Sequence, residues 1–273
     1  MCSCPISQGM VCRSVLDVAY DLPWYTSMIA SWLETVGLAE VDVVGHSLGG
    51  GIAQMLLLEC RDRIRRLVLA AAGGLGREIT TLLRLASIPF AVEHFGQPFL
   101  SLGTRLALRG VFAPDDLAEL IAMNARVGSA RAFARTVRDL IDWRGQRRRF
   151  SERAHEIHAL PPIAVLWGDR DRVIPARHAE ALTELVEGVQ LTVLEGCGHH
   201  LHVEQPDMFA RVVREFLDAP IASAPWLRRE AGGPRRVSVD SMDAITGTPA
   251  LPSSPRIRRS VSPSGDSAGW STR

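Results

Sequence analysis

The stretch VDVVGHSLGG, residues 41–50, decides how this chain folds. Its first part, Val41–Val44, is short and rich in valine, which predicts a buried β-strand. Glycines surround Ser47 and predict a sharp turn, because glycine adopts strained backbone conformations at little steric cost. The segment Gly51–Cys60 then reads as a helix. The stretch therefore places Ser47 between a buried strand and a helix.

Further strands and helices alternate on both sides of this stretch. A helix is predicted at Trp24–Val36, capped by Gly37, and a second buried strand at Arg66–Ala72. Strand, helix and strand in this order predict a parallel sheet and an α/β fold. The same alternation returns later in the chain: strands are expected at Ile163–Trp167 and Gln190–Leu194, and helices at Ala176–Val186 and Pro206–Leu217.

Two segments differ in character from this α/β pattern. From Leu75 to about His158 helical periodicity predominates, with proline breaks and no convincing strand, which predicts a helical insertion. After Asp218 the composition shifts to Pro, Ser, Gly and Arg, which predicts a disordered tail over residues 219–273. We therefore expect one folded domain over residues 1–218.

Bulk composition excludes several classes of protein. The chain has 273 residues, 47% of them hydrophobic, and a net charge of +1, so it can bury one sizeable core and offers no charge argument for binding nucleic acid. No apolar run is long enough for a transmembrane segment, and the N-terminus lacks a signal-peptide pattern. Five cysteines without a CxxC pair argue against a disulfide framework or zinc site and favour a cytoplasmic location.

Three segments carry residue types suited to nucleophilic catalysis. Ser47 lies in a G-x-S-x-G pattern, which presents a serine hydroxyl above a sheet. His199 follows the last predicted strand, at the same end of a parallel sheet, and is the candidate base that a serine nucleophile needs. A carboxylate should orient the histidine. The residues alone leave Asp169 and Asp171 open for that role.

Taken together, GHSLGG, WGDRDRVIP and GCGHHLHVEQP resemble the nucleophile, acid and histidine segments of the α/β-hydrolase fold family. The resemblance covers about residues 24–218 and implies that Asp171 is the acid, His199 the histidine and the Leu48 N–H an oxyanion donor. It also implies that residues 75–158 form the family's helical cap, in which DWRGQ (142–146) resembles the cap of some bacterial members. No cofactor or metal is implied.

The chain departs from this family before Ser47. Members normally carry four further strands and a His-Gly loop, whereas Ser47 here follows only 46 residues without a His-Gly pair. Ser14–Pro23 is a candidate remnant of the fourth strand. The loop normally supplies the second oxyanion donor, whose loss typically costs about 10²–10³ in rate. The serine strand should also form an exposed apolar edge, open to pairing in a homodimer.

These residues predict a serine hydrolase that acts on an ester or related acyl substrate through Ser47, His199 and Asp171. Cleavage of a carbon–carbon bond by the same triad, and a catalytically defective or truncated hydrolase-like protein, are the alternatives. His200 and His202 lack partners at metal-ligand spacing, so a metal site is disfavoured. An arginine cluster is expected to be a solvated face of the cap, with contact to an anionic substrate as the alternative; it comprises Arg144, Arg147, Arg148 and Arg149.

Overall fold

The computed structural model describes residues 15–88, 92, 96–153, 156, 160–186, 188–221 and 235–237. Its main feature is a parallel sheet of five strands in the order β1-β2-β5-β6-β7. The strands are β1 (Val41–His46), β2 (Ile64–Ala70), β5 (Ile163–Gly168), β6 (Gln190–Leu194) and β7 (Arg235–Val237). The expected α/β fold with a mostly parallel sheet is confirmed.

Helices between the strands provide the crossover connections that a parallel sheet requires. Helix α3 packs on β1 and β2, α2 packs on α3, and α9 packs on β5 and β6. These helices and their neighbours are α2 (Leu22–Thr35), α3 (Leu48–Glu59), the 3₁₀ turn η1 (Arg61–Arg63), α9 (Arg177–Leu185), α10 (Leu201–Glu204) and α11 (Pro206–Asp218). The predicted helices therefore all form, with ends that shift by a few residues, and α10 is added.

The central strand β5 and the edge strand β1 differ in burial. All six residues of β5 are buried between β2 and β6, as a continuous apolar strand in a parallel sheet should be. Strand β1 pairs only with β2 within the described residues, and the side chain of Val44 is 44% exposed. The strand that precedes Ser47 is therefore an exposed edge, as the sequence predicted.

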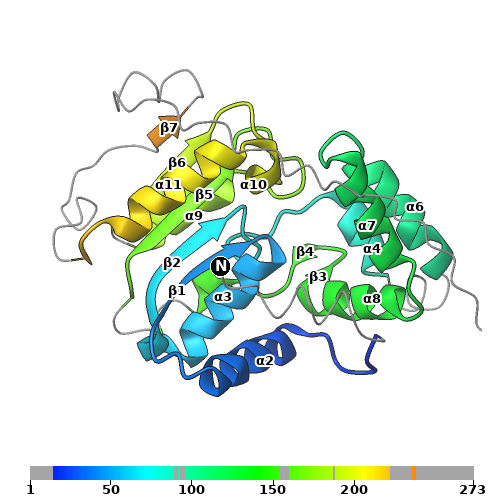
Figure 1. Cartoon of the computed structure of the whole chain (residues 1–273), viewed down its shortest axis with the longest axis horizontal. Coiled ribbons are helices and arrows are strands. Elements are labelled where there is room, and N and C mark those ends of the chain that lie inside the picture. The colour runs from blue at the N-terminus through cyan, green and yellow to red at the C-terminus, as the bar shows by residue number, and fades with distance from the viewer. Residues whose placement is uncertain are drawn as a thin grey trace, which may run out of the picture. The chain divides into compact units, whose positions relative to one another are not determined.

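The chain from residue 75 to residue 158, between β2 and β5, is mainly helical, and we call this segment the insertion. It contains α4 (Thr81–Ala86), α6 (Gln97–Leu108), α7 (Pro114–Asn124), α8 (Ser129–Leu140) and the 3₁₀ turn η2 (Phe150–Glu152). These helices gather at the side of the sheet away from β7 (Figure 1). The expectation that this segment lacks strands was wrong, because β3 (Ile141–Asp142) and β4 (Gly145–Gln146) form a short antiparallel pair.

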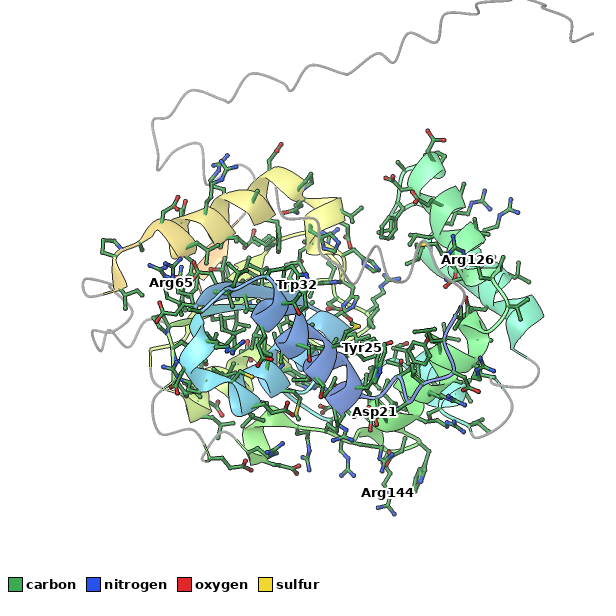
Figure 2. The ribbon with its side chains drawn as sticks, turned by 60° about the horizontal axis from the view of Figure 1, so that its bottom comes forward. Asp21, Tyr25, Trp32, Arg65, Arg126 and Arg144 are labelled. Carbon is green, nitrogen blue, oxygen red and sulfur yellow. The ribbon has the colours of Figure 1, made fainter. Side chains whose placement is uncertain are left out.

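The start of the described chain also differs from the prediction. Residues 15–20 form no strand, so they are not the remnant of a fourth strand, and Ser14 lies outside the described residues. Asp21 instead caps α2 by accepting a hydrogen bond from the Trp24 N–H at 2.9 Å, with Pro23 in the first turn. Figure 2 shows Asp21 and Tyr25 at this end of α2.

Helix α2 is fastened to the insertion by side chains at its first turns. The Leu22 N–H donates to Asp139 Oδ2 at 2.9 Å, and Tyr25 Oη lies 3.2 Å from Thr136 Oγ1. Both partners belong to α8. These bonds fix one side of the insertion relative to the helix layer of the sheet.

Strand β7 lies in the stretch that we predicted to be a disordered tail. Its three residues pair in parallel with β6, and Val237 is buried. Residues 219–221 of that stretch are described and form no strand, and the remainder, residues 222–234 and 238–273, lies outside the described residues. None of the described helices is long and apolar enough to cross a membrane.

Candidate active site

Ser47 occupies a strained turn between β1 and α3. Its φ angle is +53°, a conformation that non-glycine residues rarely adopt, and its N–H donates to Ala70 O at 3.0 Å. Neighbouring backbone approaches so closely that a Cβ on Gly45 would lie 2.5 Å from Gly49 O. A Cβ on Gly50 would lie 2.4 Å from that of Ala72. Gly45 and Gly50 are therefore required for the turn, whereas a Cβ on Gly49 would meet no atom within 4 Å.

The structure brings the three predicted site residues together. His199 Nε2 lies 3.0 Å from Ser47 Oγ, and His199 Nδ1 lies 2.8 Å from Asp171 Oδ2. The other oxygen, Asp171 Oδ1, accepts hydrogen bonds from the Val173 and Ile174 N–H groups at 2.8 and 2.9 Å. Asp169, the alternative carboxylate, is exposed. This arrangement can move a proton from the serine hydroxyl to an imidazole that a carboxylate orients.

Topology explains why residues so far apart in sequence meet. Ser47 follows β1, Asp171 follows β5 and His199 follows β6. The strands are parallel, so their carboxyl ends lie at the same edge of the sheet. Ligands and reactive groups collect at this edge in open α/β sheets.

A local hydrogen-bond network holds the histidine loop. Glu204 accepts from the N–H groups of Gly198 and His200, at 2.7 and 2.9 Å. His46 Nε2 donates to the His199 carbonyl at 2.8 Å. Burial lowers the pKa of His46 to about 3 and that of His200 to about 4. Both rings are therefore neutral near pH 7 and add no positive charge beside His199.

Other groups near Ser47 have more limited roles. Leu48 is the first residue of α3, so helix geometry leaves its N–H without an intrahelical acceptor. It is thus available to an oxyanion at the helix N-terminus. Burial raises the pKa of the Cys197 thiol to about 12, so this cysteine is an unreactive protonated thiol. The described residues contain no group of three or more His, Cys, Asp or Glu side chains arranged for a metal ion.

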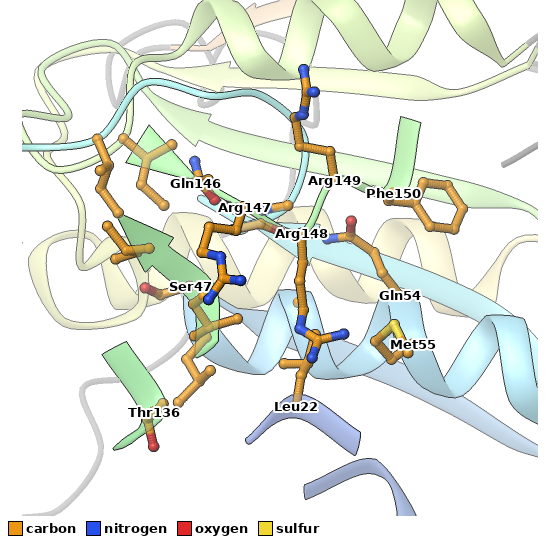
Figure 3. A pocket seen from close by; sticks show the side chains of 18 of the residues that line it. Leu22, Ser47, Gln54, Met55, Thr136, Gln146, Arg147, Arg148, Arg149 and Phe150 are labelled. Atoms are coloured by element: carbon orange, nitrogen blue, oxygen red, sulfur yellow. Dashed lines mark hydrogen bonds between the residues drawn. The ribbon is translucent and has the colours of Figure 1, made fainter. Parts of the chain in front are cut away.

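A cavity of about 440 Å³ opens beside Ser47, between α3 and the insertion. Figure 3 shows Ser47 at one end of α3, and Gln54 and Met55 further along the helix. The other wall comes from α8 and the β4–η2 segment. The apolar lining residues are Leu22, Leu48, Met55, Leu58, Ile79, Leu83, Phe133, Val137, Leu140, Ile141, Phe150 and Ile174. Its volume suits a small organic ligand.

The arginine cluster of the insertion is divided between the cavity and solvent. Arg147, Arg148 and Arg149 line the cavity. Arg144 instead stacks over the Trp143 ring, 4.7 Å from its centroid, and projects away from the protein (Figure 2). Arg144, Arg147 and Arg148 are all exposed, which fits the solvated-face prediction, although Arg147 and Arg148 also line the cavity; Arg149 is half-buried.

Two buried glutamines at the cavity were missed as site residues by sequence reasoning. Gln54 on α3 and Gln146 on β4 are 2% and 6% exposed, and both line the cavity. Gln146 is the last residue of the DWRGQ motif, and this motif was the only feature of the sequence that could have marked Gln146 as a site residue. Gln54 lies seven residues after Ser47, on the same face of α3, a position that helical periodicity could have identified.

The family model of the alpha/beta hydrolase family matches residues 12–212. A 2-hydroxymuconate semialdehyde hydrolase of Pseudomonas putida is 32% identical over 201 residues, which are 68% of this chain and 65% of that protein. An uncharacterized protein of Mycobacterium tuberculosis is 30% identical over 73% of this chain. The chain spans 62% of the length of that relative.

Solved structures share the fold at lower identity. A bromoperoxidase from Bacillus anthracis superimposes with a TM-score of 0.61 and 19% identity, over 76% of this chain and 77% of its own. A meta-cleavage product hydrolase from Pseudomonas fluorescens IP01 gives a TM-score of 0.55 and 24% identity, over 74% and 73%. The Ser47 turn, the order of the strands in the sheet and the family model all agree. This chain belongs to the alpha/beta hydrolase family.

Proposed function

We propose that this protein is a serine hydrolase that cleaves an ester or related acyl substrate. The observation that carries the proposal is the unbroken hydrogen-bonded line from Ser47 Oγ through the His199 ring to Asp171. Ser47 is the nucleophile, His199 the base and then the acid, and Asp171 the group that orients the ring. The adjoining apolar cavity would hold the substrate.

In the first step, Ser47 Oγ attacks the substrate carbonyl carbon while its proton passes to His199 Nε2. The carbonyl oxygen becomes an oxyanion, which the Leu48 N–H stabilises. Collapse of this intermediate breaks the bond to the leaving alcohol, which takes the proton from His199. Water then repeats the sequence on the acyl-enzyme, releasing the acid and restoring Ser47.

A second oxyanion donor is not assigned in this chain. With the Leu48 N–H alone, the rate would fall by about 10²–10³ relative to an enzyme with both donors. We therefore expect slow hydrolysis from this protein. If the rate falls too low to detect, the catalytically defective alternative applies.

Cleavage of a carbon–carbon bond by the same three residues is the second candidate function. It is favoured by relatives named as hydrolases of 2-hydroxymuconate semialdehyde and of 2-hydroxy-6-oxo-2,4-heptadienoate, at 32% and 30% identity. A nucleophilic or base-activating serine serves either reaction. The two functions differ in substrate, not in the proposed site residues.

The test compares the two bond types directly. Purified protein is assayed with p-nitrophenyl butyrate, followed by nitrophenolate release, and with 2-hydroxymuconate semialdehyde, followed by loss of its absorbance. We expect ester turnover that Ser47→Ala and His199→Gln abolish. Turnover of the semialdehyde alone would favour carbon–carbon cleavage, and turnover of neither by folded protein would favour the defective alternative.

We also propose that the exposed edge of β1 pairs with a second copy of the chain. Val44 in β1 is 44% exposed, and Val36 and Leu38, in the chain just before β1, are 47 and 40% exposed. An unpaired strand edge is a template for further pairing. Light scattering should give the mass of a dimer, and Val44→Lys should give a monomer. A monomeric wild-type protein at micromolar concentration would contradict the pairing.

A cytoplasmic location is part of the same proposal. Within the described residues Cys60 and Cys197 are free thiols, which suits a reducing compartment.

A further inference from the structure

The loop that follows β2 is bonded directly to the nucleophile turn. The Gly73 N–H donates to Ser47 O at 3.0 Å, in addition to the bond from the Ser47 N–H to Ala70 O. Gln54 Nε2 donates to Gly73 O at 2.7 Å. Ser47 O also accepts from the Gly50 and Gly51 N–H groups of α3, so each backbone group of Ser47 has one partner at the end of β2 or in the loop after it.

The next residue of this loop is held by the insertion. The Gly74 N–H donates to Gln146 Oε1 at 2.7 Å, and Gly74 O accepts from the Phe150 N–H at 2.7 Å. Gly74 has a φ angle of +89°, which favours glycine. The loop is thus fixed on one side by α3 and on the other by the insertion.

Gln146 uses both ends of its amide in this contact. While Oε1 accepts from Gly74, Nε2 donates to Glu78 O at 3.1 Å, and the backbone N–H donates to Arg77 O at 2.8 Å. Gly145 lets β4 approach the backbone of Arg77, because a Cβ there would lie 2.1 Å from Arg77 O. A buried amide whose donor and acceptor are both used has one preferred position.

The edge position of β1 makes this contact important for Ser47. Within the described residues β1 has a strand neighbour only on the β2 side. The strained conformation of Ser47 must be maintained by surrounding contacts. On the β2 side, those contacts run from Ser47 O through Gly73 and Gly74 to Gln146.

We propose that Gln146 is a positioning residue that sets the orientation of Ser47 through the Gly73–Gly74 loop. The inference rests on the proposed function, in which Ser47 is the nucleophile. Gln146 acts through backbone groups and is not assigned a contact with the reacting atoms. The insertion thereby controls the reactivity of the nucleophile as well as enclosing the cavity.

The experiment measures two quantities on the full chain with a fluorophosphonate probe: the fraction of protein labelled at completion, by intact mass, and the rate constant of labelling. Gln146→Met keeps the side-chain length and removes both hydrogen bonds of the amide. We expect complete labelling with a rate constant at least about tenfold lower, because small displacements of a reacting group are costly. Gln146→Glu keeps an acceptor for the Gly74 N–H and should label faster than Gln146→Met.

Asp139→Asn is the matched control. Asp139 fastens the insertion to α2 through the Leu22 N–H, and it also accepts a hydrogen bond from the Arg148 guanidinium within the insertion. Among the described residues, no hydrogen bond joins Asp139 to the loop or to Ser47. Its labelling rate should stay within about twofold of wild type. A wild-type rate for Gln146→Met, or a reduced labelled fraction with an unchanged rate constant, would overturn the inference. Failure of the wild-type protein to label would instead contradict the proposed function.

Discussion

Strands β5 and β1 are each followed by a residue of the candidate triad, Asp171 and Ser47, yet the two strands are supported very differently. All of β5 is buried between two neighbours, whereas only Gly45 of β1 is buried and, among the described strands, β1 lies at the edge of the sheet. The acid and histidine are therefore carried by the interior of the sheet. The serine is carried by an edge that relies on β2, α3 and the insertion. In one site, Asp171 and His199 are thus held by interior strands, whereas Ser47 depends on contacts outside the sheet.

The largest expected effect is a loss of kcat when Asp171, which follows the interior strand β5, is changed. Asp171→Asn should lower kcat for ester hydrolysis by about 10⁴, because the amide favours the wrong tautomer of the histidine. Asp169→Asn is the matched control, since Asp169 is exposed and two residues away. Steady-state kinetics on p-nitrophenyl butyrate provide the measurement. Equal losses in the two variants would show that Asp171 is not the orienting residue.

The contrast in burial predicts a difference in stability. Leu166→Ala in β5 should lower the free energy of unfolding by about 3 kcal/mol, because it removes a fully buried side chain and leaves a cavity. Val44→Ala in β1 should cost less than about 1 kcal/mol, since this side chain is partly exposed. Urea denaturation measures both. A cost for Val44→Ala that approaches the Leu166→Ala value would mean that the proposed dimer buries the Val44 side chain as well as pairing the strand edge.

The smallest expected effect is a pH dependence at the histidine loop. The pKa of His200 is lowered by burial to about 4, below its unfolded value of about 6.5. The unfolded state therefore binds more protons between these pH values, so stability is lost as pH falls from 6.5 toward 4. His200→Asn should reduce the slope of unfolding free energy against pH by about 1 kcal/mol per pH unit. An unchanged slope would show that His200 does not resist protonation.

Much of the sheet was predictable because each strand is a short apolar run. The segments predicted at Val41–Val44, Ile163–Trp167 and Gln190–Leu194 all form strands, with ends shifted by at most two residues. Strands β3 and β4 were missed because two-residue strands carry no periodicity. Strand β7 was missed because its sequence, Arg-Arg-Val, contains one apolar residue.

Some residues of the candidate site could also be predicted from the sequence, and others could not. Ser47 and His199 follow from motif and element order, whereas the choice of Asp171 over Asp169 needed the family resemblance. The structure places Asp171 Oδ2 2.8 Å from the histidine ring. The contacts of Gln146 could not be predicted, because they join Gly74 and Glu78 to a residue about 70 positions later. Such pairings depend on tertiary packing and leave no local pattern.

The central claim is that Ser47 is an activated nucleophile, and intact-mass analysis after fluorophosphonate treatment tests it most directly. We predict one adduct per chain, mapped to Ser47 by peptide analysis and absent from Ser47→Ala. Complete absence of an adduct on folded wild-type protein, or an adduct that persists in Ser47→Ala, would contradict the claim.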